Sequence, residues 1–192
     1  MTVGQLRLGS MGGTGQMRAL VVFESVFGST AAVARAVARG LGRHGTVELV
    51  DVAAAPATRP TLNGGDLLVV GGPTHAFGMS RVRTRRRGAE RTGDTTVIDT
   101  GIREWLAAAP PAEPASYAAT FATRAAKPRW LTGSAAHDAA QLRQLGFELI
   151  AGPEDFLVAK TSGPLLSGEL ERATRWADRL GQIARPRMSR PY

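Results

Sequence analysis

The stretch ALVVFESVFGST, residues 19–30, decides the fold of this chain. Its first part, Ala19–Ser25, is apolar and rich in β-branched side chains, which is typical of a strand buried on both faces. Helix signals follow directly. Ser29 and Thr30 can cap a helix N-terminus, and apolar residues recur at helical spacing between positions 33 and 41. The stretch therefore predicts a buried strand that turns at once into a helix.

Further strands and helices alternate along the rest of the chain. Strand-like runs occupy residues 46–52, 66–71, 117–122, 147–151 and 156–160, and helical patterns lie in several of the intervals between them. Parallel strands joined by crossover helices are the usual result of such alternation. The sequence therefore predicts an α/β fold, a doubly wound parallel sheet with helices on both faces.

Length and composition fit one domain. The chain has 192 residues, of which 43% are hydrophobic. Residues 1–17 are predicted to form a disordered leader, 18–184 the domain, and 185–192 a basic C-terminal tail. Cysteine is absent, which excludes disulfides and thiolate ligands. With neither a secretory signal nor an apolar run of about 18 residues, we expect no membrane contact and a cytoplasmic location.

Ligands of doubly wound sheets bind beyond the carboxyl ends of the strands, where three loops of this chain should meet. In the first loop, Ser25–Thr30, backbone amides at a helix N-terminus and several hydroxyls favour a phosphate group. Neither the P-loop motif nor the dinucleotide fingerprint is present. Taken alone, this loop is equally consistent with an ordinary helix cap.

The other two loops carry groups suited to a ring. The second, GGPTHAFGM at residues 71–79, places apolar and imidazole side chains where polar ones are usual. The third starts at Thr123 and Arg124, and this arginine can face the polar edge of a flavin or form a surface ion pair. No histidines and carboxylates share metal-ligand spacing, so no metal site is predicted.

Together the three loops resemble the flavodoxin-like family. The segment ESVFGST resembles its phosphate loop, and GGPTHAFGM resembles the flavin-contacting loop of Wrb-type quinone reductases. The resemblance implies a five-stranded sheet in the order 2-1-3-4-5 and a bound flavin mononucleotide (FMN). It assigns the following FMN contacts: Ser25, Phe27, Gly28, Ser29 and Thr30 around the phosphate, Pro73, Thr74, His75, Phe77 and Gly78 on one side of the ring, and Thr123 and Arg124 on the other.

Three functions remain open at this point. The first is electron transfer between partner proteins, in which the flavin does the chemistry and no catalytic side chain is needed. The second is an enzyme, a flavin-dependent NAD(P)H:quinone oxidoreductase. The third is a binding module that kept the fold and lost FMN, which the phenylalanine at position 27 favours because it replaces a phosphate-binding hydroxyl.

The net charge of +8 is concentrated in one internal segment and in the C-terminal residues. Arg81–Arg91 contains six arginines and one glutamate. This segment can be a solvated insertion or can dock an acidic redox partner protein. Nucleic acid is the least supported partner, because no aromatic residues interleave with the arginines for base stacking.

Overall fold

The computed structural model describes residues 17–52, 62–63, 65–74, 101–127, 133–160 and 163–188. Its strands are β1 (Met17–Phe23), β2 (Gly45–Asp51), β3 (Leu67–Pro73), β4 (Tyr117–Ala125), β5 (Glu148–Leu149) and β6 (Glu154–Val158). Its helices are α1 (Ser29–Leu41), α3 (Ile102–Ala107), α4 (Ala135–Gln144) and α5 (Glu169–Met188). The last helix therefore continues into the stretch predicted as a tail.

All paired strands of the sheet run parallel, in the order β2-β1-β3-β4, and the next position is shared by β5 and β6. The predicted order 2-1-3-4-5 and the predicted fold class are confirmed. Tyr117 of β4 pairs with Glu148, whereas Phe121 pairs with Glu154. Between these two pairs, the segment that faces β4 contains two more residues than β4 does. This insertion divides the fifth position of the sheet into β5 and β6.

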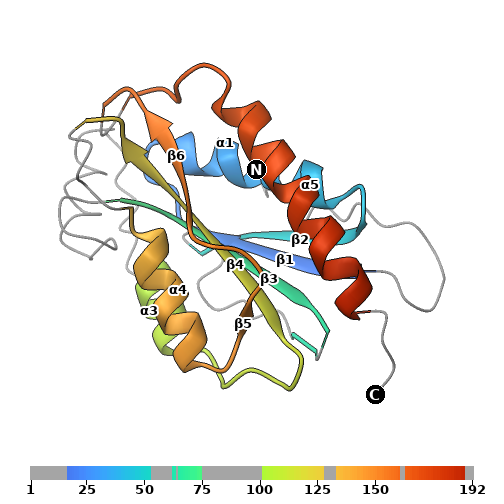
Figure 1. Cartoon of the computed structure of the whole chain (residues 1–192). Coiled ribbons are helices and arrows are strands. Elements are labelled where there is room, and N and C mark those ends of the chain that lie inside the picture. The colour runs from blue at the N-terminus through green and yellow to red at the C-terminus, as the bar shows by residue number, and fades with distance from the viewer. Residues whose placement is uncertain are drawn as a thin grey trace, which may run out of the picture.

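Two layers of helices cover the sheet (Figure 1). Helices α1 and α5 lie on one face, and α3 and α4 lie on the other. Strand β1 shows why both faces need cover. Val21 points into the core beneath α1 and α5, and Val22 points into the core beneath α3 and α4, and both are fully buried.

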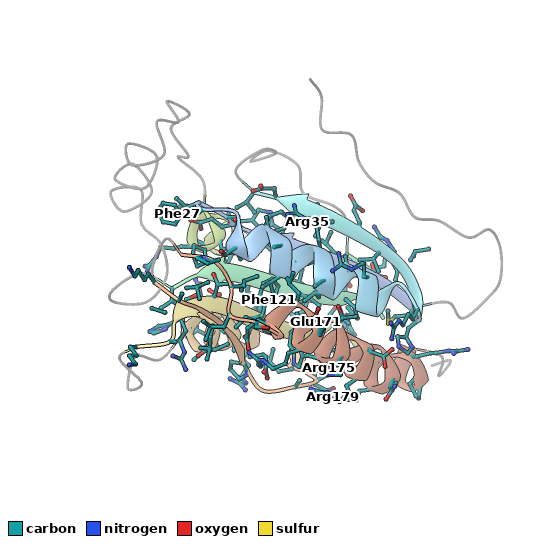
Figure 2. All side chains as sticks on the ribbon, turned by 90° about the horizontal axis from the view of Figure 1, so that it is seen from above. Phe27, Arg35, Phe121, Glu171, Arg175 and Arg179 are labelled. Carbon is teal, nitrogen blue, oxygen red and sulfur yellow. The ribbon has the colours of Figure 1, made fainter. Side chains whose placement is uncertain are left out.

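An aromatic cluster fills the core under α1 and α5. Phe121 of β4, Phe156 of β6 and Trp176 of α5 meet edge to face, with ring centroids 6.0–6.3 Å apart. In the view of Figure 2, Phe121 lies between α1 and α5. The neighbouring strand β3 leaves room for this ring only because residue 71 is glycine, since a Cβ there would lie 2.0 Å from Phe121 Cζ.

We expect Gly71→Ala to destabilise the protein by about 1–3 kcal/mol, because the added methyl group overpacks the aromatic cluster. Gly72→Ala is the matched control, since its Cβ would meet only Ile102 Cγ1, at an ordinary 3.8 Å. The control should be as stable as the parent or slightly more stable. Urea denaturation of both variants measures this, and equal midpoints would contradict the packing argument.

Candidate functional site

A small hollow lies at the carboxyl edge of the sheet. It is lined by residues of all three loops singled out in the sequence and by one residue of β6. These are Phe27, Ser29, Thr30, Pro73, Thr74, Thr123, Arg124 and Ala125, with Val158 from β6. The hollow has a volume of about 20 Å³, enough for a water-sized group. The fold therefore brings together residues almost a hundred positions apart in sequence, as expected if the carboxyl ends of the parallel strands meet at one edge of the sheet. Binding of a ligand by them stays a prediction.

The first loop presents backbone amides to this hollow. Gly28 is the N-cap of α1 and adopts a left-handed conformation (φ 85°) with open space around its Cα. Ser29 and Thr30 are the first two helical residues, and within the described part of the chain no acceptor meets their N–H groups. The first turn of α1 contains no acidic residue. This helix end therefore keeps its positive partial charge, which suits an anion.

Helix α1 is capped differently from the sequence prediction. Ser29 and Thr30 were expected to cap it, but the glycine at position 28 takes the N-cap and places both inside the helix, so that prediction is wrong. The side chain of Ser25 instead satisfies an amide of the first turn, because its Oγ accepts a hydrogen bond from the N–H of Ala31 at 3.1 Å. One of the four orphan amides of α1 is thus satisfied by the protein itself.

The hydroxyls of the first loop have partners within the protein. Ser29 Oγ donates to the carbonyl of Gly163 at 3.2 Å. Thr30 Oγ1 and Thr123 Oγ1 are 2.8 Å apart, and both residues are buried. These contacts tie the first loop to β4 and to the turn after β6. The backbone amides of Ser29 and Thr30 are the groups of this loop that meet no acceptor among the described residues.

In the second loop, Thr74 links β4 to the start of α4. Its N–H donates to the carbonyl of Thr123 at 2.8 Å, and its Oγ1 accepts from the N–H of Ser134 at 3.0 Å. Pro73 is half-buried beside it. The predicted contacts His75, Phe77 and Gly78 lie outside the described residues, as do Trp130 and Thr132 of the third loop.

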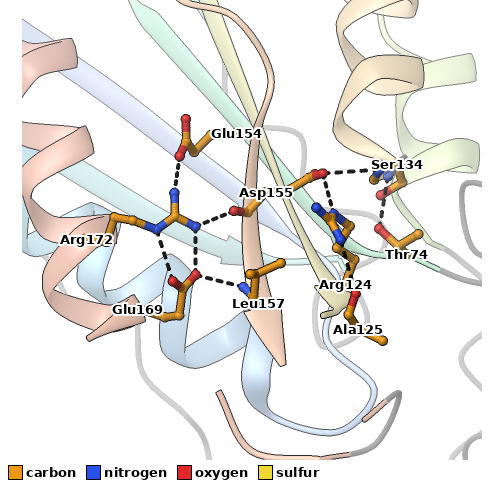
Figure 3. A network of polar contacts seen from close by, with 10 residues as sticks. Thr74, Arg124, Ala125, Ser134, Glu154, Asp155, Leu157, Glu169 and Arg172 are labelled. Atoms are coloured by element: carbon orange, nitrogen blue, oxygen red, sulfur yellow. Dashed lines mark hydrogen bonds and ion pairs between the residues drawn. The ribbon is translucent and has the colours of Figure 1, made fainter. Parts of the chain in front are cut away.

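Arg124 forms an ion pair, one of the two roles that its sequence position allowed, the other being a contact with a flavin. Its Nε donates to Asp155 Oδ2 at 2.8 Å, and its Nη1 donates to the carbonyl of Ala125 at 3.2 Å. The same carboxylate oxygen accepts from the N–H of Gly133 at 3.2 Å (Figure 3). The charge that we expected beside a flavin is therefore balanced by a carboxylate.

Asp155 also connects the site to α5. Its backbone carbonyl accepts from Arg172, whose guanidinium in addition pairs with Glu154 and Glu169 (Figure 3). Hydrogen bonds from Arg172 and from the N–H of Leu157 lower the pKa of Glu169 against the opposing effect of burial. Sequence reasoning missed Asp155. The only signal was the pair of acidic residues, Glu154 and Asp155, that follows the Gly-Pro turn.

A buried carboxyl pair lies beneath the site on the α3–α4 side. Glu24 follows β1, is 1% exposed, and accepts from the N–H of Ile102 at 3.0 Å. Asp138 of α4 is also 1% exposed, and neither of its oxygens has a hydrogen-bond partner among the residues that the structure describes. Burial, and secondly the charge of Glu24, raises the pKa of Asp138 to about 8, while Arg103 acts in the opposite direction.

Sequence reasoning also missed this pair, although a signal existed. Asp138 falls on the same helical stripe as the buried residues Ala135, Ala139 and Leu142. A carboxylate inside an apolar stripe indicates a buried titratable group. Among the described residues, no group of three or more His, Cys, Asp or Glu is placed to hold a metal ion.

Comparison with known proteins gives matches at the level of structure. No known protein-family profile matches the sequence, and no curated protein sequence matches it either. Solved structures do match. The chain superposes on a flavodoxin from the domain Archaea with a TM-score of 0.55 at 17% identity, which covers 88% of this chain and 99% of that one. The fold is flavodoxin-like.

Two other structures give the same result. Oxidised flavodoxin 1 from Bacillus cereus matches with a TM-score of 0.56 at 11% identity, over 87% of this chain and 96% of that one. A flavodoxin, WrbA-like protein from Agrobacterium tumefaciens matches with a TM-score of 0.54 at 19% identity, over 88% and 98%. These matches support the flavodoxin-like fold across the domain. No described helix is long and apolar enough to cross a membrane.

Asp138→Asn tests the buried carboxyl. The folded protein holds the Asp138 proton up to about pH 8, whereas the unfolded chain releases it near its ordinary pKa of 3.8. Asp138 therefore makes stability fall as pH rises from about 4 to 8, by up to about 1.4 kcal/mol per pH unit. The variant should lose this slope and gain stability most at pH 8.

Thermal unfolding at several pH values measures the effect. Glu171→Gln is the matched control, because Glu171 is exposed on α5 (Figure 2) and its substitution likewise replaces a carboxyl group by an amide. This control should keep the slope of the parent protein. An unchanged slope in Asp138→Asn would show that Asp138 ionises normally in the folded protein.

Proposed function

We propose that this protein binds FMN at the carboxyl edge of its sheet and transfers electrons between partner proteins. One observation carries the proposal. At the N-terminus of α1, the amides of Ser29 and Thr30 meet no acceptor among the described residues and lie at the edge where the second and third loops also arrive. The first turn of this helix has no acidic side chain. Such a helix end favours a phosphate monoester without any lysine.

The residues fit the phosphate end of FMN. Gly28 has no neighbour within 4 Å of an added Cβ, so a ligand can approach its backbone closely. Phe27 is half-buried and lines the hollow. Thr30 and Thr123, whose buried hydroxyls are hydrogen-bonded to each other, also line it. The hollow itself holds only a small group, and the contacts proposed for the ring, among them His75, Phe77 and Gly78, belong to the second and third loops.

In this proposal the flavin supplies the redox chemistry and the protein supplies binding and orientation. The flavodoxins among the matched structures support the same assignment at the level of fold. The net charge of +8 favours an acidic redox partner. We propose that Arg81–Arg91, with its six arginines, docks that partner.

FMN binding is tested by titration with FMN and with riboflavin, which lacks the phosphate, followed by quenching of flavin fluorescence. If α1 holds the phosphate, FMN should bind at least about tenfold more tightly than riboflavin, in line with a charge-assisted hydrogen bond of 1.5–3 kcal/mol. Ser29→Glu places a carboxylate at the same helix end and should remove this difference, and it should not destabilise α1.

Ile183→Glu is the control for Ser29→Glu. It adds the same negative charge at an exposed position of α5, four residues after Arg179. The control should keep the preference for FMN. Equal affinity of the unmodified protein for FMN and riboflavin would contradict the phosphate site, and absence of binding to both would favour the binding module that lost FMN.

The second candidate function is a flavin-dependent NAD(P)H:quinone oxidoreductase. The match to the WrbA-like protein favours it, and so does the Pro73–Thr74 start of the second loop.

Steady-state NADPH oxidation with benzoquinone separates the two functions. An electron carrier loaded with FMN should turn over no faster than the same concentration of free FMN, because it has no site for the nicotinamide. Turnover well above free FMN that saturates with NADPH would assign the enzymatic function instead.

A further inference from the structure

A second cavity lies at the opposite end of the sheet from the candidate site. It is enclosed by the C-terminal ends of α3 and α4, the proline-rich turn at residues 109–113, and the starts of β3 and β4. Its volume is about 320 Å³. In Figure 1 this region lies below the labels of α3 and α4, away from the arrowheads of the strands. The two sites are therefore separated by the length of the sheet.

The wall of this cavity is largely apolar. Leu68, Leu106, Leu142 and Phe147 are buried around it, and Trp105 contributes an aromatic surface that is 4% exposed. An apolar cavity of about 150 Å³ is large enough to bind benzene, and small-molecule sites begin at about 300 Å³. This cavity therefore has room for two fused rings.

The hydroxyl of Ser116 is a polar group set into the apolar wall. Ser116 is 3% exposed, and its Oγ has no hydrogen-bond partner in the part of the chain that the structure describes. The backbone of the same residue is fully engaged, since its N–H donates to Glu113 and its carbonyl accepts from Glu148. The backbone of Ser116 is thus held in place, while its hydroxyl meets no partner among the described residues. A buried hydroxyl without a partner is unfavourable, and a ligand oxygen would satisfy it.

The mouth of the cavity is more polar than its wall. Glu113 lines it and is exposed to solvent, as are Pro110 and Pro111. A carboxylate at the opening disfavours anionic ligands, and the apolar wall disfavours any charged group. The cavity therefore selects for neutral molecules.

We propose that this cavity binds a neutral, largely aromatic small molecule of about two fused rings, whose single oxygen hydrogen-bonds to Ser116 Oγ. The site is independent of the FMN site. It provides the protein with a second ligand at the amino ends of its strands, beyond the function proposed above.

Calorimetric titration with 2-naphthol tests the proposal, with naphthalene as the probe that lacks the oxygen. Ser116→Ala should weaken binding of 2-naphthol about five- to tenfold and leave naphthalene unchanged, as expected for the loss of one hydrogen bond. The same variant should be at least as stable as the parent, because it removes an unsatisfied hydroxyl. Ala109→Trp fills the cavity and should abolish binding of both probes.

Ser29→Glu, at the other edge of the sheet, is the control and should bind 2-naphthol as the parent does. Three results would overturn the proposal: no binding of 2-naphthol to the parent, equal binding to Ser116→Ala, or loss of binding in the control. If Ala109→Trp fails to fold, Ser116→Ala still decides the outcome. FMN affinity should be unchanged in Ser116→Ala, so failure here is distinguishable from failure of the FMN proposal.

Discussion

Strand β1 imposes the constraint on which the rest of the structure depends. It is hydrogen-bonded to β2 on one side and to β3 on the other, and helices cover both of its faces. A strand in this position must be apolar throughout, and its neighbours must run parallel because each connection crosses over a face of the sheet. All carboxyl ends then meet at one edge. The position of the candidate site follows from this geometry rather than from any single side chain.

The sequence therefore predicts the fold well, and it also predicts that the three loops meet at one edge of the sheet. Continuous apolar runs and helical spacing identify β1, β3 and α1, and the strand order follows from the family resemblance. The division of the fifth strand is less predictable. Two strand-like runs joined by a Gly-Pro turn are visible in the sequence, but only the pairing with β4 shows that both occupy one position of the sheet.

The partners of individual side chains are harder to predict, because they depend on residues far away in sequence. Thr30 and Thr123 are 93 positions apart, and nothing local indicates that their hydroxyls meet. Arg124 was equally consistent with a flavin contact and with an ion pair until Asp155, 31 positions away, was placed beside it. Asp138 differs from these, since its own helix already indicates a buried carboxyl group.

The hydrogen bonds that hold the first loop have a consequence for the proposed binding of FMN. Ser25 already satisfies the amide of Ala31, and Thr30 is anchored to β4, so the geometry of this loop does not depend on an added anion. A preorganised loop binds without ordering itself first, and the conformational entropy cost of binding is small. Under the FMN proposal, the protein should therefore stay folded without FMN. The fraction without FMN would then be set by the concentration of free FMN and the dissociation constant, as mass action requires.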